Sequence, residues 1–162
     1  MEEKYRALFL ELEKELLEVK RAYEKSEDVY SVEAPSPNYA TFTTSPEVLR
    51  MFFSEKMCSS LKKSVLVAED ILALLKEDRD RVRGRKSFPE WYKKNVEKYK
   101  ITLEKLRLTA EFVLSNKNFK RFVSDDVIKE IKNGVLDLLK ESKNYFKTVT
   151  DKNESLFFLK EI

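Results

Sequence analysis

The chain has 162 residues, of which 42% are hydrophobic and 38% are charged, and its net charge is +3 at neutral pH. This length suits one domain with a sizeable core, and the composition excludes a disordered tail. No run approaches the roughly 18 consecutive apolar residues of a membrane-spanning helix, which excludes a membrane protein.

The sequence carries no sign of secretion. The first residues, MEEKYR, lack the basic start and the apolar run of a secretory signal. Cys58 is the single cysteine, so no disulfide can form within the chain and a reducing, cytoplasmic location is expected. Histidine is absent while Lys and Glu are abundant; this bias resembles that of hyperthermophile proteins, although chance in a short helical chain also explains it.

Charge is distributed unevenly along the chain. Residues 1–33 hold six basic and ten acidic side chains, whereas residues 76–124 hold fifteen basic and seven acidic ones. The net charge of +3 therefore conceals an acidic first segment and a basic middle segment. Asymmetry of this kind can reflect an acidic partner.

The first predicted helix spans about residues 2–28. Its large apolar residues recur at alternating steps of four and three, and so share one face: Tyr5, Phe9, Leu12, Leu16, Val19 and Tyr23. Leu8 and Leu17 are expected to widen this buried stripe.

Residues 31–46 interrupt the helical pattern. The segment holds three of the four prolines and no Lys or Arg, and its large apolar groups are Tyr39 and Phe42. A connection of this length is a packed crossover, a functional loop or a disordered segment. We expect a crossover packed by Tyr39 and Phe42, with a partner-binding loop as the alternative.

A second helix is predicted from Pro46 to about Val82. Ser45 is a favoured capping residue, and proline suits the first helical position. The apolar stripe consists of Leu49, Phe53, Met57, Leu61, Val65, Ala68, Leu72 and Leu75. Cys58 lies near this face and is expected to fill the core rather than act as a nucleophile.

A third helix is predicted to begin with an S-x-x-E capping box formed by Ser87 and Glu90, and to fade near Ser115. It carries the most regular stripe in the chain: Tyr92, Val96, Tyr99, Leu103, Leu106, Ala110 and Val113. Other helices must cover this stripe.

A short helical turn is expected at residues 118–123. Ser124 then caps a fourth long helix, with Asp125 and Asp126 at its positive end. Its stripe consists of Ile128, Ile131, Val135, Leu138, Tyr145 and Val149. The apolar tail at 150–162 is a short helix, a strand or a docking segment, and we expect it to be buried.

Short links from the second to the third long helix and from the third to the fourth predict antiparallel neighbours. The expected fold class is therefore all-α. Residues 1–162 form a single helical domain, an antiparallel bundle of about four long helices with a long first connection and a short C-terminal segment.

The sequence lacks the residues that most catalytic sites need. Without histidine there is no imidazole base, no Ser-His or Cys-His nucleophile and no histidine metal ligand. One cysteine cannot build a thiolate zinc site, and two isolated glycines cannot form a phosphate loop. Asp78 and Asp80 resemble a Mg²⁺ ligand pair, but the arginines around them favour local ion pairing. We expect no enzymatic activity, no cofactor, no metal and no small-molecule substrate.

The strongest candidate for a functional site is the basic segment KEDRDRVRGRKSFPEWYKKNVEKYK, residues 76–100. Phosphates pair with Arg and Lys and bases stack on aromatic rings, so this mixture can bind nucleic acid. A protein interface and a solvated charged surface with packed aromatics are the alternatives. The candidate binding residues are Arg79, Arg81, Arg83, Arg85, Lys86, Trp91, Lys93, Lys94 and Lys98.

The C-terminal part of the chain resembles a known family. SDDVIKEIKNGVLDLLKESKNYF at 124–146, followed by a polar turn and SLFFLKEI at 155–162, resembles the last helix of the helical domain in GINS-type replication proteins, where it leads into a small β domain. EKYKITLEKLRLTAEFVL at 97–114 is similar to an inner helix of that domain. The resemblance implies a non-catalytic scaffold that joins the replicative helicase, and it assigns no role to an individual residue.

We expect a non-catalytic helical assembly or adaptor subunit that binds a protein partner through the basic turn at 79–91 or the segment 31–46. The alternative is a nucleic-acid-binding accessory protein, such as a GINS-like replisome scaffold, that uses the basic segment 76–124. A third hypothesis is homo-oligomerisation, in which the acidic first helix of one copy meets the basic middle of another.

Overall fold

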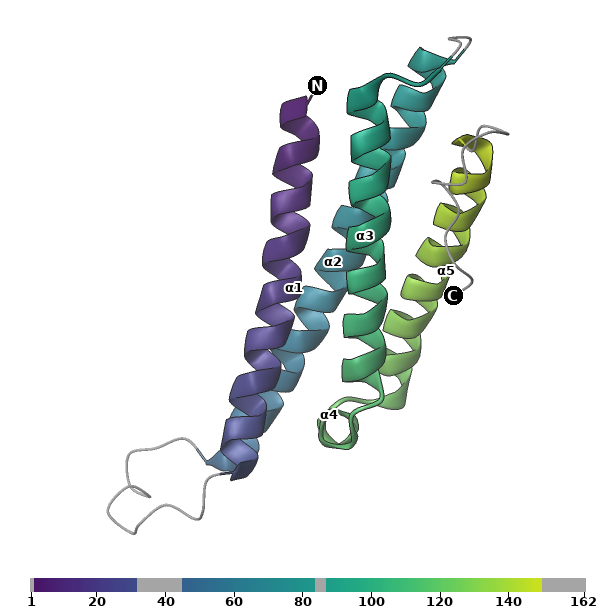
Figure 1. Cartoon of the computed structure of the whole chain (residues 1–162). Helices are drawn as coiled ribbons and strands as arrows, with labels where there is room; N and C mark the ends of the chain where they lie inside the picture. The colour runs from purple at the N-terminus through teal and green to yellow at the C-terminus, as the bar shows by residue number, and fades with distance from the viewer. Residues whose placement is uncertain (1, 32–44, 84–86, 150–162) are drawn as a thin grey trace.

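The structure is a computed structural model that describes residues 2–31, 45–83 and 87–149. No strand occurs among these residues, which form five helices: α1 (Glu2–Ser31), α2 (Pro46–Val82), α3 (Glu90–Leu114), α4 (Lys117–Phe122) and α5 (Asp125–Val149). The four long helices are antiparallel in chain order (Figure 1). The all-α bundle predicted from the sequence is therefore confirmed. The predictions for the first connection and the C-terminal tail fall on residues 32–44 and 150–162, outside the described part.

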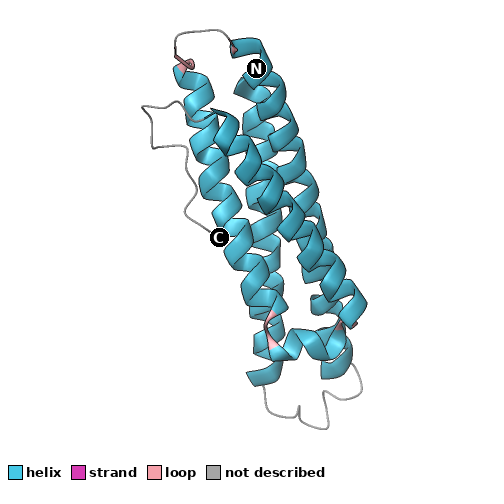
Figure 2. Ribbon diagram, turned by 90° about the vertical axis from the view of Figure 1, so that its right-hand side faces the viewer, coloured by secondary structure: helices cyan, strands magenta, loops and turns pink. Residues whose placement is uncertain are grey.

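The long helices do not form a square bundle. α2 contacts α1, α3 and α5, and α3 also contacts α1 and α5. α1 and α5 thus lie on opposite sides of the α2/α3 pair, and Figure 1 shows α1 and α3 side by side in front of α2. Figure 2, turned by 90°, shows the long helices along one common direction, with the short α4 across one end.

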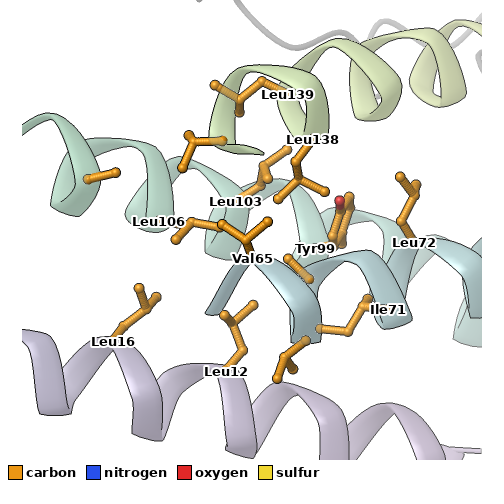
Figure 3. Packing of buried hydrophobic residues seen from close by; sticks show 14 of the residues in the cluster. Leu12, Leu16, Val65, Ile71, Leu72, Tyr99, Leu103, Leu106, Leu138 and Leu139 are labelled. Carbon is orange, nitrogen blue, oxygen red and sulfur yellow. The ribbon is translucent and has the colours of Figure 1, made fainter. Parts of the chain in front are cut away.

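The core is built from the apolar stripes that the sequence predicts. Every residue of the α3 stripe, from Tyr92 to Val113, is at most 2% exposed. Figure 3 shows the labelled side chains of α1, α2, α3 and α5 converging on a shared interior, among them Leu12, Val65, Leu103 and Leu138. Burying one side chain of this size contributes about 1.5–3 kcal/mol, so this interior is the main source of stability.

Side-chain caps define several helix ends. The Ser45 hydroxyl accepts a hydrogen bond from the Val48 N–H at 3.3 Å, with Pro46 at the first position of α2. The Ser124 hydroxyl accepts from the Val127 N–H at 3.3 Å at the start of α5. Both caps were expected from the sequence, because serine can satisfy an N–H that has no partner within the helix.

The predicted Ser87–Glu90 capping box is wrong. α3 begins at Glu90 with Pro89 at its N-cap, and no side chain caps it. A proline disfavours α conformation in the residue before it, so Phe88 cannot take the first helical position that a Ser87 cap requires.

The predicted contribution of Leu17 to the buried stripe is also wrong. Its side chain is 44% exposed, whereas the neighbouring Leu16 is 9% exposed. One step along a helix turns a side chain by about 100°, and this rotation carries Leu17 out of the interior.

Candidate functional site

Arg79, the first of the predicted basic residues, contacts α5 within the bundle. Its Nη1 donates a hydrogen bond to Thr148 Oγ1 of α5 at 2.6 Å, and its guanidinium carbon lies 5.7 Å from the centroid of the Tyr145 ring. Only 20% of this side chain is exposed. Arg79 therefore joins α2 to α5.

The acidic residues around Arg79 and Arg81 form the local ion pairs expected from the sequence. Arg81 Nη2 donates to Glu77 Oε1 at 2.7 Å one turn earlier, and Arg81 Nη1 lies 3.7 Å from Asp78 Oδ1. Asp80 Oδ1 lies 3.6 Å from Arg79 Nε. These pairs occupy the carboxylates of the D-x-D sequence.

The remaining predicted basic residues follow the turn between α2 and α3. Arg83 occupies the C-cap position of α2 and is exposed, and Arg85 and Lys86 lie outside the described residues. Lys93 is half-buried and Lys94 is exposed on the first turns of α3. A common binding surface for these cations stays a prediction.

Trp91 and Lys98 also make contacts within the chain. The half-buried Trp91 packs against the core and meets the Tyr92 ring edge-on, with 5.9 Å between centroids. Lys98 is exposed, and its Nζ lies 4.9 Å from the centroid of the Phe9 ring of α1. Lys98 therefore forms part of the contact between α1 and α3.

A buried polar cluster links α1, α2, α3 and α5. Tyr5 Oη donates to Asp78 Oδ2 at 2.5 Å, and Asp78 is 0% exposed. The hydroxyls of Tyr92 and Tyr145 lie 2.5 Å apart, and Tyr92 also donates to the Leu75 carbonyl at 3.4 Å. Hydrogen bonds of this kind are required because an unpaired polar group in the interior is strongly unfavourable.

Burial dominates the acid–base behaviour of these phenols. Desolvation raises the pKa of Tyr5, and the Asp78 carboxylate raises it further. Burial also raises the pKa of Tyr92, to about 12, and those of Tyr145 and Tyr99 above their ordinary value. All four phenols are therefore protonated at neutral pH, where they act as hydrogen-bonding groups of the core.

Cys58 and the potential metal ligands complete the list of chemistry-bearing groups in the described residues. Burial raises the pKa of the Cys58 thiol to about 11, so the reactive thiolate is scarce at neutral pH. No three His, Cys, Asp or Glu side chains converge as a metal site requires in residues 2–31, 45–83 and 87–149. No helix of the described chain is both long enough and apolar enough to cross a membrane.

Exposed apolar side chains gather on one side of α1 and α3. Ten large hydrophobic side chains are exposed among the described residues, and five of them lie on these two helices, with exposures of 44–60%: Leu10, Leu17, Ile101, Leu108 and Phe112. Both helices lie side by side in Figure 1, so these side chains belong to neighbouring elements.

Each of the two helices carries these residues in a regular outward stripe. The α3 stripe repeats at steps of four and three and is exposed throughout: Lys94, Lys98, Ile101, Lys105, Leu108, Phe112 and Ser115. The α1 stripe has the same rhythm and is also exposed: Glu3, Arg6, Leu10, Glu13, Leu17, Lys20 and Glu24. We call the two stripes together the α1/α3 face.

An open groove of about 1170 Å³ lies between the two stripes. Its apolar lining includes Leu16, Leu17, Leu108 and Val113, while the rings of Tyr23 and Phe112 meet edge-on with 4.8 Å between centroids. Charged side chains also line it: Glu13, Lys20, Glu24, Lys105 and Glu111. An apolar surface rimmed by polar groups is typical of an interaction site.

The sequence pattern predicts the basic segment as a candidate site but not the α1/α3 face. The signal for the face is nevertheless present in α3, which carries two stripes of the same rhythm offset by two residues. An offset of two residues turns a helix by about 200°, so one stripe faces the core and the other faces solvent. One apolar face is enough for a helix in a bundle, and a second one indicates a further contact.

No family model, no curated protein and no solved structure matches this chain. The resemblance of residues 97–146 to the GINS helical domain therefore stays a prediction.

Proposed function

We propose that this chain is a non-catalytic helical assembly subunit that binds a protein partner through the α1/α3 face. The observation that supports the proposal is the alignment of five exposed large apolar side chains along two adjacent helices. Three of them, Leu17, Leu108 and Phe112, line a groove of about 1170 Å³. The polar cluster around Asp78 does not line this groove, and the groove offers an apolar docking surface with charged side chains around it.

The driving force for binding is the burial of the exposed apolar area on this face. Fully burying one large side chain gains about 1.5–3 kcal/mol, so completing the burial of one that is half exposed gains about 1 kcal/mol. Five such side chains supply about 5 kcal/mol before the entropy of association is subtracted. Ion pairs at the rim add orientation and specificity more than affinity.

A photo-crosslinking amino acid placed at Leu108 is expected to form a discrete protein adduct, either with purified chain or in extract of the producing cells. Leu66 of α2 is the matched control, because it is also an exposed leucine in the middle of a long helix, at 59% against 52% for Leu108. The outward side of α2 points away from α1 and α3, so position 66 is expected to give no adduct. Adduct mass and mass spectrometry give the readout.

Two outcomes would contradict the proposal. One is the absence of any adduct at position 108 under both conditions, and the other is equal labelling from positions 66 and 108. Adding Leu17→Asp to the chain that carries the crosslinker at position 108 provides a further check. A partner bound to the face is expected to lose contact when a carboxylate replaces this apolar side chain of the groove.

A nucleic-acid-binding accessory, including a replisome-type scaffold, is the second candidate. It is favoured by the exposed cations Arg83, Lys94 and Lys98 near the α2–α3 turn, but Arg79 and Arg81 already have partners within the chain. Trp91 fluorescence titrated with DNA and RNA tests it. We expect any binding to vanish at near-physiological salt; saturable binding that persists there would favour this candidate.

A further inference from the structure

We propose that the occupant of the α1/α3 face is a second copy of this chain. The two copies form a two-fold dimer whose axis runs along the bundle, so that α1 of each copy lies on α3 of the other. This inference rests on the proposed function, because it names the partner of the same face.

The first step is to establish which residues of α1 and α3 lie at the same height along the bundle axis. Lys98 Nζ sits over the Phe9 ring at 4.9 Å, and the Tyr23 and Phe112 rings meet at 4.8 Å. Both pairs differ by 89 in residue number, so a residue of α1 is level with the α3 residue numbered 89 higher. α1 and α3 run in the same direction, as alternate helices of an antiparallel bundle do.

The second step is the match between the stripes at that level. A two-fold axis along the bundle keeps every residue at its own height and exchanges left and right, so α1 of one copy meets α3 of the other at the same level. Leu10 then lies within two residues of Ile101 of the second copy, and Leu17 lies within two residues of Leu108. Two residues correspond to about 3 Å along a helix, so apolar groups meet apolar groups.

The third step is charge. The α3 stripe carries Lys94, Lys98 and Lys105 and no carboxylate, whereas the α1 stripe carries three glutamates against Arg6 and Lys20. In the proposed dimer Glu3 lies beside Lys94 of the second copy, and Glu13 lies between Lys98 and Lys105. Within the described residues, none of the charged side chains of the α1/α3 face is in an ion pair, although Lys98 lies over the Phe9 ring, so these charges can pair with those of a second copy.

The other face-to-face arrangement has its axis across the helices and places α3 on α3. It would bring three lysines of each copy onto a stripe without any carboxylate, which is electrostatically unfavourable. The charge pattern therefore selects the arrangement in which α1 meets α3.

The size of the face is sufficient for a dimer. The 25 residues of α3 span about 37 Å, and two neighbouring helices are together about 20 Å wide. The face thus covers about 750 Å², close to the roughly 800 Å² that each partner buries in a stable interface.

The decisive experiment uses charge reversal in two separate full-length chains. Glu13→Lys alone and Lys105→Glu alone each place like charges together twice in a symmetric dimer, and each is expected to raise the dimer dissociation constant roughly 10-fold. Mixing the two variants is expected to restore it to within about 3-fold of the unmodified chain, because both contacts in the mixed dimer join opposite charges. Sedimentation equilibrium gives the dissociation constants.

Recovery on mixing separates contacts between chains from contacts within one chain. Mixing does not change the charges at positions 13 and 105 within either variant chain. A contact between these positions inside one chain therefore cannot produce recovery. Leu108→Asp is expected to weaken the dimer roughly 100-fold, whereas Leu66→Asp leaves it unchanged, and circular dichroism verifies that both variants fold.

Three results would overturn the dimer. The purified chain stays monomeric at high micromolar concentration, or its dimer persists in Leu108→Asp, or the mixed variants fail to recover. If the purified chain is monomeric while position 108 still labels one discrete protein in extract, the dimer is refuted and the proposed function remains. If position 108 gives no adduct at all, both are refuted.

Discussion

Between pH 10 and pH 12 the free energy of unfolding is expected to fall by about 8 kcal/mol, and the helices to unfold cooperatively. Tyr5, Tyr92, Tyr99 and Tyr145 are at most 2% exposed, and burial raises the pKa of each above the ordinary value near 10. The unfolded chain then releases four phenolic protons that the folded chain retains. A total stability of about 5–15 kcal/mol is typical, so a loss of about 8 kcal/mol is of the same size as the whole stability.

The sign follows from the direction of the shifts. A group whose pKa is raised by folding stabilises the folded state fully below its unfolded pKa. This stabilisation is lost as the pH rises from about 10 through the folded value, which for Tyr92 is about 12. Each retained proton changes the free energy by about 1.4 kcal/mol per pH unit.

Phenolate absorbance and far-ultraviolet circular dichroism, followed together, measure the effect. The phenolate signal of at least four tyrosines is expected to appear at the same pH at which the helical signal disappears. Tyr23→Phe is the control, because Tyr23 is only partly buried and its removal leaves the four core phenols in place. Ionisation of the core phenols with the helices intact would contradict the prediction.

Tyr5→Phe is expected to lower the free energy of unfolding by about 3 kcal/mol at neutral pH. Its hydroxyl donates to Asp78 Oδ2 at 2.5 Å, and Asp78 is 0% exposed. Without that hydroxyl, Oδ2 has no donor, while Oδ1 faces Arg81 Nη1 at 3.7 Å, beyond hydrogen-bond length. A buried carboxylate that loses its donor is far less stable than one that keeps it.

A double-mutant cycle separates this effect from lost packing. Asp78→Leu removes the carboxylate at similar volume but leaves the Tyr5 hydroxyl unpaired, so it is also expected to be destabilising. The double variant is expected to lose less than the sum of the two single changes, because neither polar group is then left without its partner. Urea unfolding of the four chains measures the coupling, and simple additivity would argue against the hydrogen bond.

The helices and the core could be predicted from the sequence because they depend on local rules. A four–three rhythm places Tyr92 and Val113 on the same face of a helix, whichever element covers that face. Ser45 and Ser124 mark helix starts because capping depends on a few neighbouring residues. The exception at Ser87 is local too, and it arises from the proline two residues later.

The arrangement of the helices could not be predicted in the same way. Periodicity identifies which face is buried but not which helix covers it, so the α2/α3 pair at the centre and the outer positions of α1 and α5 do not follow from the pattern. The Tyr5–Asp78 hydrogen bond joins residues 73 positions apart, and no local rule connects them. The assembly face is likewise visible only once α1 and α3 are known to be neighbours.

The two opposed stripes of α3 have a consequence for how this protein can evolve. Residues from Tyr92 to Val113 on one side are constrained by the packing of the whole bundle. Residues from Lys94 to Ser115 on the other side are constrained by what lies on them and, at Lys98 and Phe112, by contacts with α1. A lineage can therefore exchange binding partners, or separate from a former partner copy after gene duplication, through changes on the outer stripe alone. The residues of α3 that determine the fold and those that determine binding can in this sense change independently.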